Sequence, residues 1–165
     1  MTENFDWLPP LVLFETYNGD WDRYLDVLYN FFKKDFIVSK PLYKGQKLAL
    51  KRHPVLKGKE ATFWHLISEG KYEEDRLPDL RRCERIRWPR PIIDHAGDVE
   101  IKVWENKRKS EKRVCLWLED HEYIVILAKR RDYILLWTAY PVTKTHQKLK
   151  LRKEYEDYKK ADAAP

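Results

Sequence analysis

Residues 99–142 decide the fold of this chain: VEIKVWENKRKSEKRVCLWLEDHEYIVILAKRRDYILLWTAYPV. Runs rich in β-branched and aromatic residues alternate here with short polar segments, which is typical of strands joined by turns. Tight turns at Asp120-His121 and Arg131-Asp132 would make the strands they join antiparallel. The pattern predicts a four-stranded antiparallel meander with strands at 99–105, 112–119, 122–130 and 133–142.

Helical patterns lie on both sides of this meander. Asn18-Gly19-Asp20 can cap a helix with apolar residues at helical spacing, and the WPRP sequence at 88–91 is expected to end another. The predicted helices are 20–34, 60–68, 77–87 and 143–160, with a short strand near 48–50. The fold class expected is α+β, with N-terminal helices followed by a four-stranded antiparallel β-meander and a C-terminal helix, in one domain of residues 1–160 and a disordered tail at 161–165.

Composition limits the classes of protein to consider. The 165 residues are 43% hydrophobic and 14% aromatic, enough for one domain with a core. The 33 Lys and Arg against 27 Asp and Glu give a net charge of +6, which favours a polyanionic partner, although a solvated charged surface explains it equally well.

Localisation and cofactor use are also bounded by the sequence. Two cysteines outside any CxxC pair argue against a disulfide framework or a zinc site, and the acidic start with Pro9-Pro10 does not fit a secretory signal. We therefore expect a cytoplasmic protein without a membrane partner. The sequence contains no HExxH, nucleophile elbow or glycine-rich phosphate loop, so no cofactor and no metal are expected.

The faces of the predicted sheet differ in chemistry. If both tight turns have two residues, an aliphatic face would pack on the helices and would also carry Thr138 and Tyr140. The opposite face would be a platform for nucleic acid, because bases stack on aromatic rings with about 1–3 kcal/mol each. The alternative is that the C-terminal helix covers its tryptophans. The basic and aromatic residues of that face are Lys102, Trp104, Arg113, Trp117, Arg130, Tyr133 and Trp137.

A second candidate region is RHPVLKGKEATFWHLISEG, residues 52–70, in which His53 and His65 flank Lys57 and Lys59. Cleavage of RNA without a metal needs a base, an acid and cations beside the phosphate. Histidine titrates near neutral pH and lysine stays charged, so these residue types suffice. The alternatives are that His65 is a hydrogen-bonded, half-buried residue and that His53 is a surface loop residue.

The run LAKRRDYILLWTAYPV, residues 127–142, resembles the C-terminal strands of the barnase/EndoU/colicin/RelE-like ribonuclease superfamily. The helices-then-sheet order agrees with that superfamily. The resemblance implies that His53 and His65 form the acid/base pair and that Lys57 or Lys59 is the phosphate cation. It also implies that Arg130 or Arg131 holds the substrate, that Thr138 orients the phosphate and that Tyr140 contacts the base or ribose.

The leading hypothesis is a metal-independent endoribonuclease of toxin or phage type, and the resemblance implies an acidic antitoxin or inhibitor as a further partner besides RNA. One alternative is a non-catalytic nucleic-acid-binding module; another is a structural or assembly protein with an aromatic oligomer interface. The candidate catalytic residues are His53, His65, Lys57, Arg130, Thr138 and Tyr140. The candidate nucleic-acid-binding residues are Lys59, Lys102, Trp104, Arg113, Trp117, Arg131, Tyr133 and Trp137.

Overall fold

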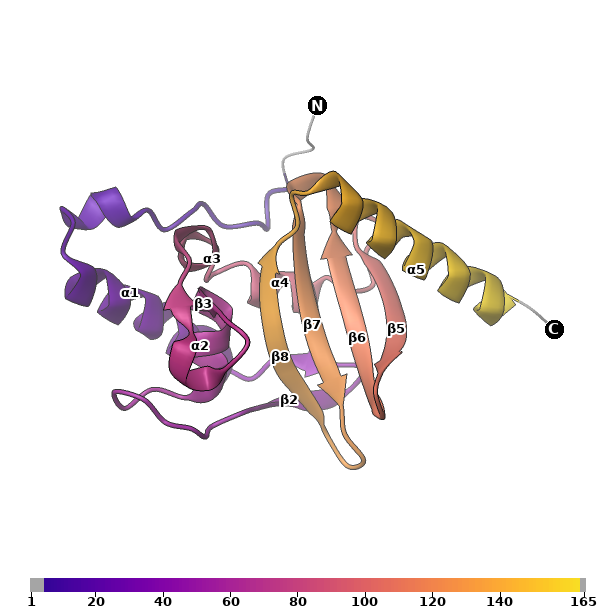
Figure 1. Cartoon of the computed structure of the whole chain (residues 1–165), viewed down its shortest axis with the longest axis horizontal. Helices are drawn as coiled ribbons and strands as arrows, with labels where there is room; N and C mark the ends of the chain where they lie inside the picture. Colours follow the sequence, from indigo (N-terminus) through magenta and orange to yellow (C-terminus); the bar gives the residue numbers. More distant parts are fainter. Residues whose placement is uncertain (1–4, 164–165) are drawn as a thin grey trace.

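The computed structural model describes residues 5–163, and its fold is α+β (Figure 1). A curled sheet has α1 to α4 packed toward one face and the long helix α5 on the other (Figure 1). The helices are α1 (Trp21–Lys33), α2 (Ala61–Ile67), α3 (Leu80–Glu84), α4 (Pro89–Asp94) and α5 (Thr145–Ala163), with shorter helical turns η1 (Phe14–Tyr17), η2 (Lys34–Val38), η3 (Glu73–Asp75) and η4 (Glu119–His121).

The main sheet has six strands in the order β1-β2-β8-β7-β6-β5. The predicted meander is present as β5 to β8, but it is part of a larger mixed sheet that also contains β1 and β2. β2 pairs in parallel with β8, through Leu48 opposite Ile134 and Leu50 opposite Leu136. The strands are β1 (Leu42–Tyr43), β2 (Gln46–Leu50), β5 (Lys102–Arg108), β6 (Glu111–Leu118), β7 (Tyr123–Lys129) and β8 (Ile134–Pro141); β3 (Ser68–Glu69) and β4 (Leu77–Pro78) form a separate hairpin.

A bulge in β8 changes which residues share a face. Leu127 pairs with Leu136, but the preceding residue of β7, Ile126, pairs with Thr138, so Trp137 is the extra residue. A bulge of this kind reverses the facing of all later residues in the strand. The prediction that Thr138 and Tyr140 lie on the aliphatic face is therefore wrong: both lie on the opposite face.

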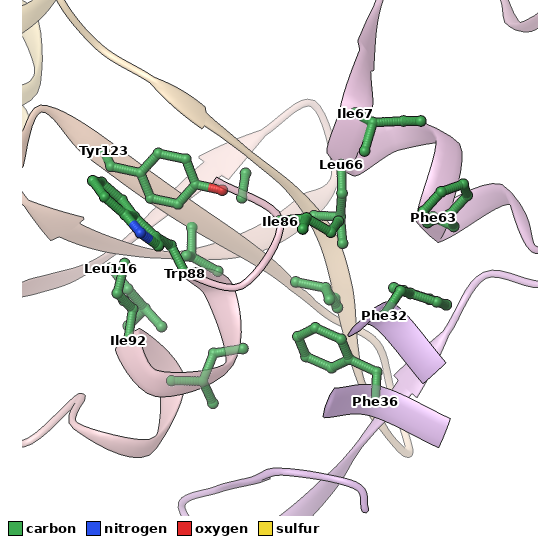
Figure 2. Close-up of a cluster of buried hydrophobic side chains, with 14 of the residues drawn as sticks. Phe32, Phe36, Phe63, Leu66, Ile67, Ile86, Trp88, Ile92, Leu116 and Tyr123 are labelled. Carbon is green, nitrogen blue, oxygen red and sulfur yellow. The ribbon is translucent and has the colours of Figure 1, made fainter. Parts of the chain in front are cut away.

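Most of the buried apolar residues form one core between the helices and the aliphatic face of the sheet (Figure 2). Phe32 of α1 and Phe63 of α2 lie with ring centroids 5.5 Å apart. Trp88, before α4, packs edge-on against Tyr123 of β7 at 5.3 Å. These contacts pack α2 on α1 and the segment after α3 on β7.

Helix α5 covers the tryptophan face of the sheet. Trp104 and Trp117 are 1% and 0% exposed, and the Tyr155 ring lies edge-on to Trp104 at 5.8 Å. Glu154 accepts hydrogen bonds from Trp104 Nε1 at 3.3 Å and from Asn106 Nδ2 at 2.9 Å. Trp104 and Trp117 therefore cannot stack on a base or form an aromatic oligomer interface while α5 is in place, which is a correction to their predicted role.

Two helix predictions need correction in the region after α2. Leu77-Pro78 pairs with Ser68-Glu69, so the third helix is shorter than predicted. The prolines of WPRP begin α4 because proline is tolerated in the first turn of a helix, where its missing N–H has no partner to lose. At the C-terminal end, residues 161–163 belong to α5, while 164–165 lie outside the described residues.

Candidate functional site

A polar cleft of about 300 Å³ lies where α2 meets β8 and the β3–β4 hairpin. We call it the His65 cleft. Half-buried aromatic side chains of β8 form one wall, and the loop between β3 and β4 forms the other. It is lined by His65, Glu69, Gly70, Lys71, Glu73, Arg76, Arg82, Trp137, Thr138 and Tyr140.

His65 is held in this cleft by the ends of α2. At the start of the helix, Thr62 Oγ1 accepts a hydrogen bond from the backbone N–H of Lys51 at 2.7 Å, which ties α2 to the end of β2. Near the other end, Thr138 Oγ1 donates to the carbonyl oxygen of His65 at 3.2 Å. The imidazole is buried, with 4% of the residue exposed, and lies edge-on to Trp137 at 5.6 Å between ring centroids.

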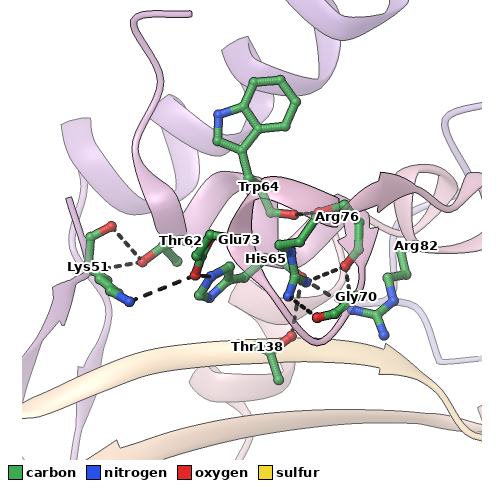
Figure 3. Close-up of polar contacts among 10 residues, drawn as sticks. Lys51, Thr62, Trp64, His65, Gly70, Glu73, Arg76, Arg82 and Thr138 are labelled. Carbon is green, nitrogen blue, oxygen red and sulfur yellow. Dashed lines mark hydrogen bonds and ion pairs between the residues drawn. The ribbon is translucent and has the colours of Figure 1, made fainter. Parts of the chain in front are cut away.

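His65 and Glu73 form a hydrogen-bonded pair, with 2.6 Å between His65 Nε2 and Glu73 Oε1 (Figure 3). Burial raises the pKa of Glu73, but the bond to His65 and the nearby charges of Lys51 and Arg76 outweigh burial and leave the pKa below its usual value. Burial lowers the pKa of His65, and Glu73 only partly opposes this. Near neutral pH the pair is therefore a carboxylate beside a neutral imidazole.

This charge state decides which nitrogen of His65 carries the proton. A carboxylate can only accept hydrogen bonds, so Nε2 must be the donor. The remaining nitrogen, Nδ1, then has a free lone pair, and it has no hydrogen-bond partner among residues 5–163. His65 is consequently arranged as a proton acceptor.

Two arginines hold the β3–β4 loop, and with it Glu73, in place (Figure 3). Arg76 donates to Ser68 Oγ at 3.0 Å and to the carbonyl oxygens of Gly70 and Ser68 at 3.1 and 2.5 Å. Arg82 donates through Nη1 to the Ser68 carbonyl oxygen at 2.8 Å. Gly70 has φ of +149°, and a Cβ there would lie 3.0 Å from the Cα of Arg76, so the loop requires glycine.

Positive charge and aromatic rings are interleaved around the cleft. Two cations lie over the Trp137 ring: Lys51, with Nζ 5.6 Å from the ring centroid, and Arg113, with Cζ 4.9 Å from it. Arg82 lies 5.2 Å from the centroid of Tyr140. Cation–π contacts of this kind fix the cations beside a surface on which a base can stack.

The structure brings some of the predicted site residues together and separates others. His65, Trp137, Thr138 and Tyr140 line the cleft, but His53 does not. His53 is exposed in the loop before α2, so the structure does not place the two histidines in one cleft. The prediction that His53 and His65 form an acid/base pair is therefore corrected. The loop after His53 forms its own turn, in which the backbones of Leu56 and Lys59 are hydrogen-bonded to each other.

The predicted cations also lie elsewhere. Lys57 lines a larger groove of about 710 Å³ beside Trp64, and Lys59 lies over the Tyr29 ring at 5.1 Å. Arg130 pairs with Glu111 at 3.1 Å and lines a different pocket together with Tyr133. The remaining predicted residues are Arg131, exposed in the β7–β8 turn, and Lys102, paired with Glu119 at 2.6 Å.

The sequence interpretation missed Lys51, Glu73, Arg76 and Arg82. Glu73 stands eight residues after His65 in an irregular loop, and no periodic pattern joins them. The isolated Gly70 is the sequence feature that could have indicated the position of Glu73. It lies between Ser68-Glu69 and Leu77-Pro78, adopts a positive φ and belongs to the hairpin that returns Glu73 to α2.

No protein-family model, curated protein or solved structure matches this chain. The superfamily resemblance thus stays a prediction from residues 127–142. Within residues 5–163, no three or more His, Cys, Asp or Glu side chains gather closely enough to hold a metal ion. None of the helices in the same range is both long and apolar enough to cross a membrane.

Proposed function

We propose that the protein is a metal-independent endoribonuclease of toxin or phage type whose reaction centre is the His65 cleft. The observation that carries this proposal is the 2.6 Å hydrogen bond between the buried His65 imidazole and the Glu73 carboxylate, with Lys51 3.8 Å from that carboxylate. A base of this kind suits removal of a proton from the ribose 2′-hydroxyl, and DNA lacks that group. The net charge of +6 favours a polyanionic substrate and, as the resemblance implies, an acidic inhibitor protein.

In the proposed reaction, His65 Nδ1 accepts the proton of the 2′-hydroxyl as the 2′-oxygen forms a bond to phosphorus. The bond from phosphorus to the 5′-oxygen breaks, which gives a 2′,3′-cyclic phosphate and a free 5′-hydroxyl. Burial raises the pKa of Tyr140, so its hydroxyl stays protonated near neutral pH and can give a proton to the leaving oxygen. Proton transfers of this kind contribute about 10²–10⁴-fold each.

Cations stabilise the charge that develops on the phosphate oxygens. Lys51 lies 3.8 Å from Glu73, and Lys71 lines the cleft and is exposed. Among residues 5–163 the guanidinium of Arg82 forms its hydrogen bonds through Nη1, so Nε and Nη2 remain for a phosphate. Thr138, which bonds to the His65 backbone, supports the helix end in this scheme.

The test is incubation of the protein with total RNA in the presence of a chelator, with His65→Ala and His53→Ala as a matched pair. We expect His65→Ala to cleave about 10²–10⁴-fold more slowly and His53→Ala to stay within about tenfold of wild type. Products should end in 2′,3′-cyclic phosphate, and a DNA oligonucleotide of the same sequence should remain intact. Equal activity of the two variants, or cleavage that stops with the chelator, would contradict the proposal.

A second candidate function is RNA binding without turnover. It is favoured by the half-buried Trp137, which has two cations near its ring and would contact a base without the need for His65. In that case RNA would be retarded on a gel but not cut, and the retardation would weaken steeply with salt. Trp137→Ala would abolish it, whereas His65→Ala would leave it intact.

A further inference from the structure

The open groove of about 710 Å³ beside Trp64 is a second feature of the surface around α2. We call it the Trp64 groove. Glu73 and Arg76 line both this groove and the His65 cleft, so the β3–β4 loop separates the two. Trp64 and His65 are adjacent on α2, but their side chains point in different directions (Figure 3). The apolar lining of the groove includes Trp21, Val55, Leu56, Trp64 and Pro78.

One wall of the Trp64 groove is a hydrogen-bonded turn, residues 54–59, which we call the lip. The backbones of Leu56 and Lys59 exchange hydrogen bonds at 3.1 and 3.0 Å, and Trp64 Nε1 donates to the carbonyl oxygen of Leu56 at 3.1 Å. Val55 also lines a cavity of about 350 Å³ on its other side, so the lip is a ridge between two hollows. Val55 and Leu56 are 48% and 54% exposed. A ridge that is apolar and already ordered loses little conformational entropy when it enters another surface.

Opposite charges stand on two walls of the groove. Lys57 belongs to the lip and Glu74 to the β3–β4 loop, and both are exposed. The side chain of neither forms an ion pair or a hydrogen bond with another residue in the range 5–163. An occupant that matches the groove must therefore present an anion to the lip, a cation to the loop and apolar groups between them. The lip and the β3–β4 loop of a second copy of this chain supply that set.

We propose that the Trp64 groove is the contact between two copies of this chain, each of which inserts Val55 and Leu56 of its lip into the groove of the other. A two-fold axis makes such a contact reciprocal. If Lys57 of one copy meets Glu74 of the second, then Glu74 of the first meets Lys57 of the second. The inference goes beyond the proposed function and does not depend on it, because His65 and Glu73 are hydrogen-bonded within a single chain.

The experiment is analytical ultracentrifugation of the full chain between about 1 μM and about 1 mM. We expect a monomer–dimer equilibrium with a dissociation constant in this range. Lys57→Glu and Glu74→Lys should each weaken association about tenfold or more, because each variant places two pairs of like charges in the contact. An equal mixture of the two variants should associate within about threefold of wild type, because both pairs in the mixed dimer carry opposite charges again.

A third variant tests the apolar part of the contact. Leu56→Ser removes an apolar side chain from the lip and should weaken association as well. The matched controls lie on α5: Leu149→Ser, at a 56% exposed position, and Lys150→Glu, which is also exposed. Both controls should associate like wild type. Circular dichroism of each variant confirms that it is folded.

The outcomes are separable from those of the proposed function. A chain that stays monomeric up to about 1 mM would overturn the inference. So would a dimer that the three groove variants leave unchanged, a dimer that the α5 controls weaken equally, or a mixture that associates no better than its two components. RNA cleavage is tested separately by His65→Ala, and its failure would leave the contact between copies standing.

Discussion

The pairing of His65 with Glu73 gives the first prediction at the scale of single residues. In Glu73→Gln the side chain can still accept a hydrogen bond but no longer carries the charge that fixes Nε2 as the donor. We expect RNA cleavage to fall by about 10²-fold or more. Since Glu73 raises the pKa of His65, the acid limb of the pH–rate profile should also move to lower pH. Glu74→Gln, the adjacent exposed residue, should change neither quantity, and a Glu73→Gln enzyme with the wild-type profile would contradict the assignment.

A second prediction concerns the pH dependence of stability. Burial holds the pKa of His65 below its usual value of 6.5, so below that pH the unfolded chain binds more protons than the folded protein. The free energy of unfolding should therefore fall as the pH drops from about 6.5 through the folded-state pKa of His65. The lowered pKa of Glu73 acts in the same direction at more acidic pH.

Urea unfolding across this pH range checks the prediction. His65→Gln should show a smaller slope of unfolding free energy against pH, whereas His146→Gln, at an exposed position on α5, should keep the wild-type slope. Identical slopes in all three proteins would show that His65 titrates in the folded state as it does in the unfolded chain.

Residues of the candidate site could be predicted from the sequence only where they belong to a local pattern. His65, Trp137, Thr138 and Tyr140 could be named from the sequence because they stand in or beside regular elements. Lys51, Glu73, Arg76 and Arg82 could not be named, because their contacts arise from an irregular loop that folds back onto α2. The pairing of His53 with His65 failed for the same reason, since spacing along the chain does not show which way a loop turns.

At the scale of elements, the bulge in β8 is the feature that regular alternation could not predict. Strand parity placed Lys102, Trp104, Arg113 and Trp117 correctly on one face because β5 to β7 pair without irregularity. The same parity failed for Thr138 and Tyr140, which follow the extra residue Trp137. The candidate site exists because of this departure from alternation.

Helix α5 gives the prediction at this scale. Tyr155 packs edge-on against Trp104, so Tyr155→Ala removes part of the cover over the buried tryptophans. We expect the free energy of unfolding to fall by about 1–3 kcal/mol, less than for a fully buried aromatic because Tyr155 is half-buried. Chemical denaturation followed by tryptophan fluorescence measures it. The exposed neighbour Glu156→Ala should stay within about 0.5 kcal/mol of wild type, and an equal effect of both would mean that α5 packs loosely.

At the scale of the whole molecule, the parallel pair of β2 with β8 joins the N-terminal third of the chain to its last strand. Leu48 lies opposite Ile134 in this pair and is 1% exposed. We expect Leu48→Ala to lower the free energy of unfolding by about 2–5 kcal/mol and to reduce RNA cleavage, because β2 leads directly into Lys51. Leu42→Ala, at a 55% exposed position of β1, should cost less than about 0.5 kcal/mol by the same denaturation measurement. Similar losses in both variants would contradict the central place given to β2.

The α+β class, the meander and most helices could be predicted because each depends on local periodicity. The pairing partner of β2 could not, since a parallel pair leaves no turn signal between its strands. The sequence did not decide whether α5 covers the tryptophan face of the sheet, because the same tryptophans suit an exposed platform or a buried layer.

The parallel pairing also has a consequence for how the protein comes into being on the ribosome. The chain emerges from its N-terminal end, yet β2, α2 and the loop with Glu73 have no wall to close against until β8, which ends at Pro141, has left the exit tunnel. Long-range pairing of this kind forms late. Until β8 has emerged, a growing chain therefore lacks one wall of the His65 cleft, and a protein that cuts RNA by the proposed route would be unable to attack its own messenger.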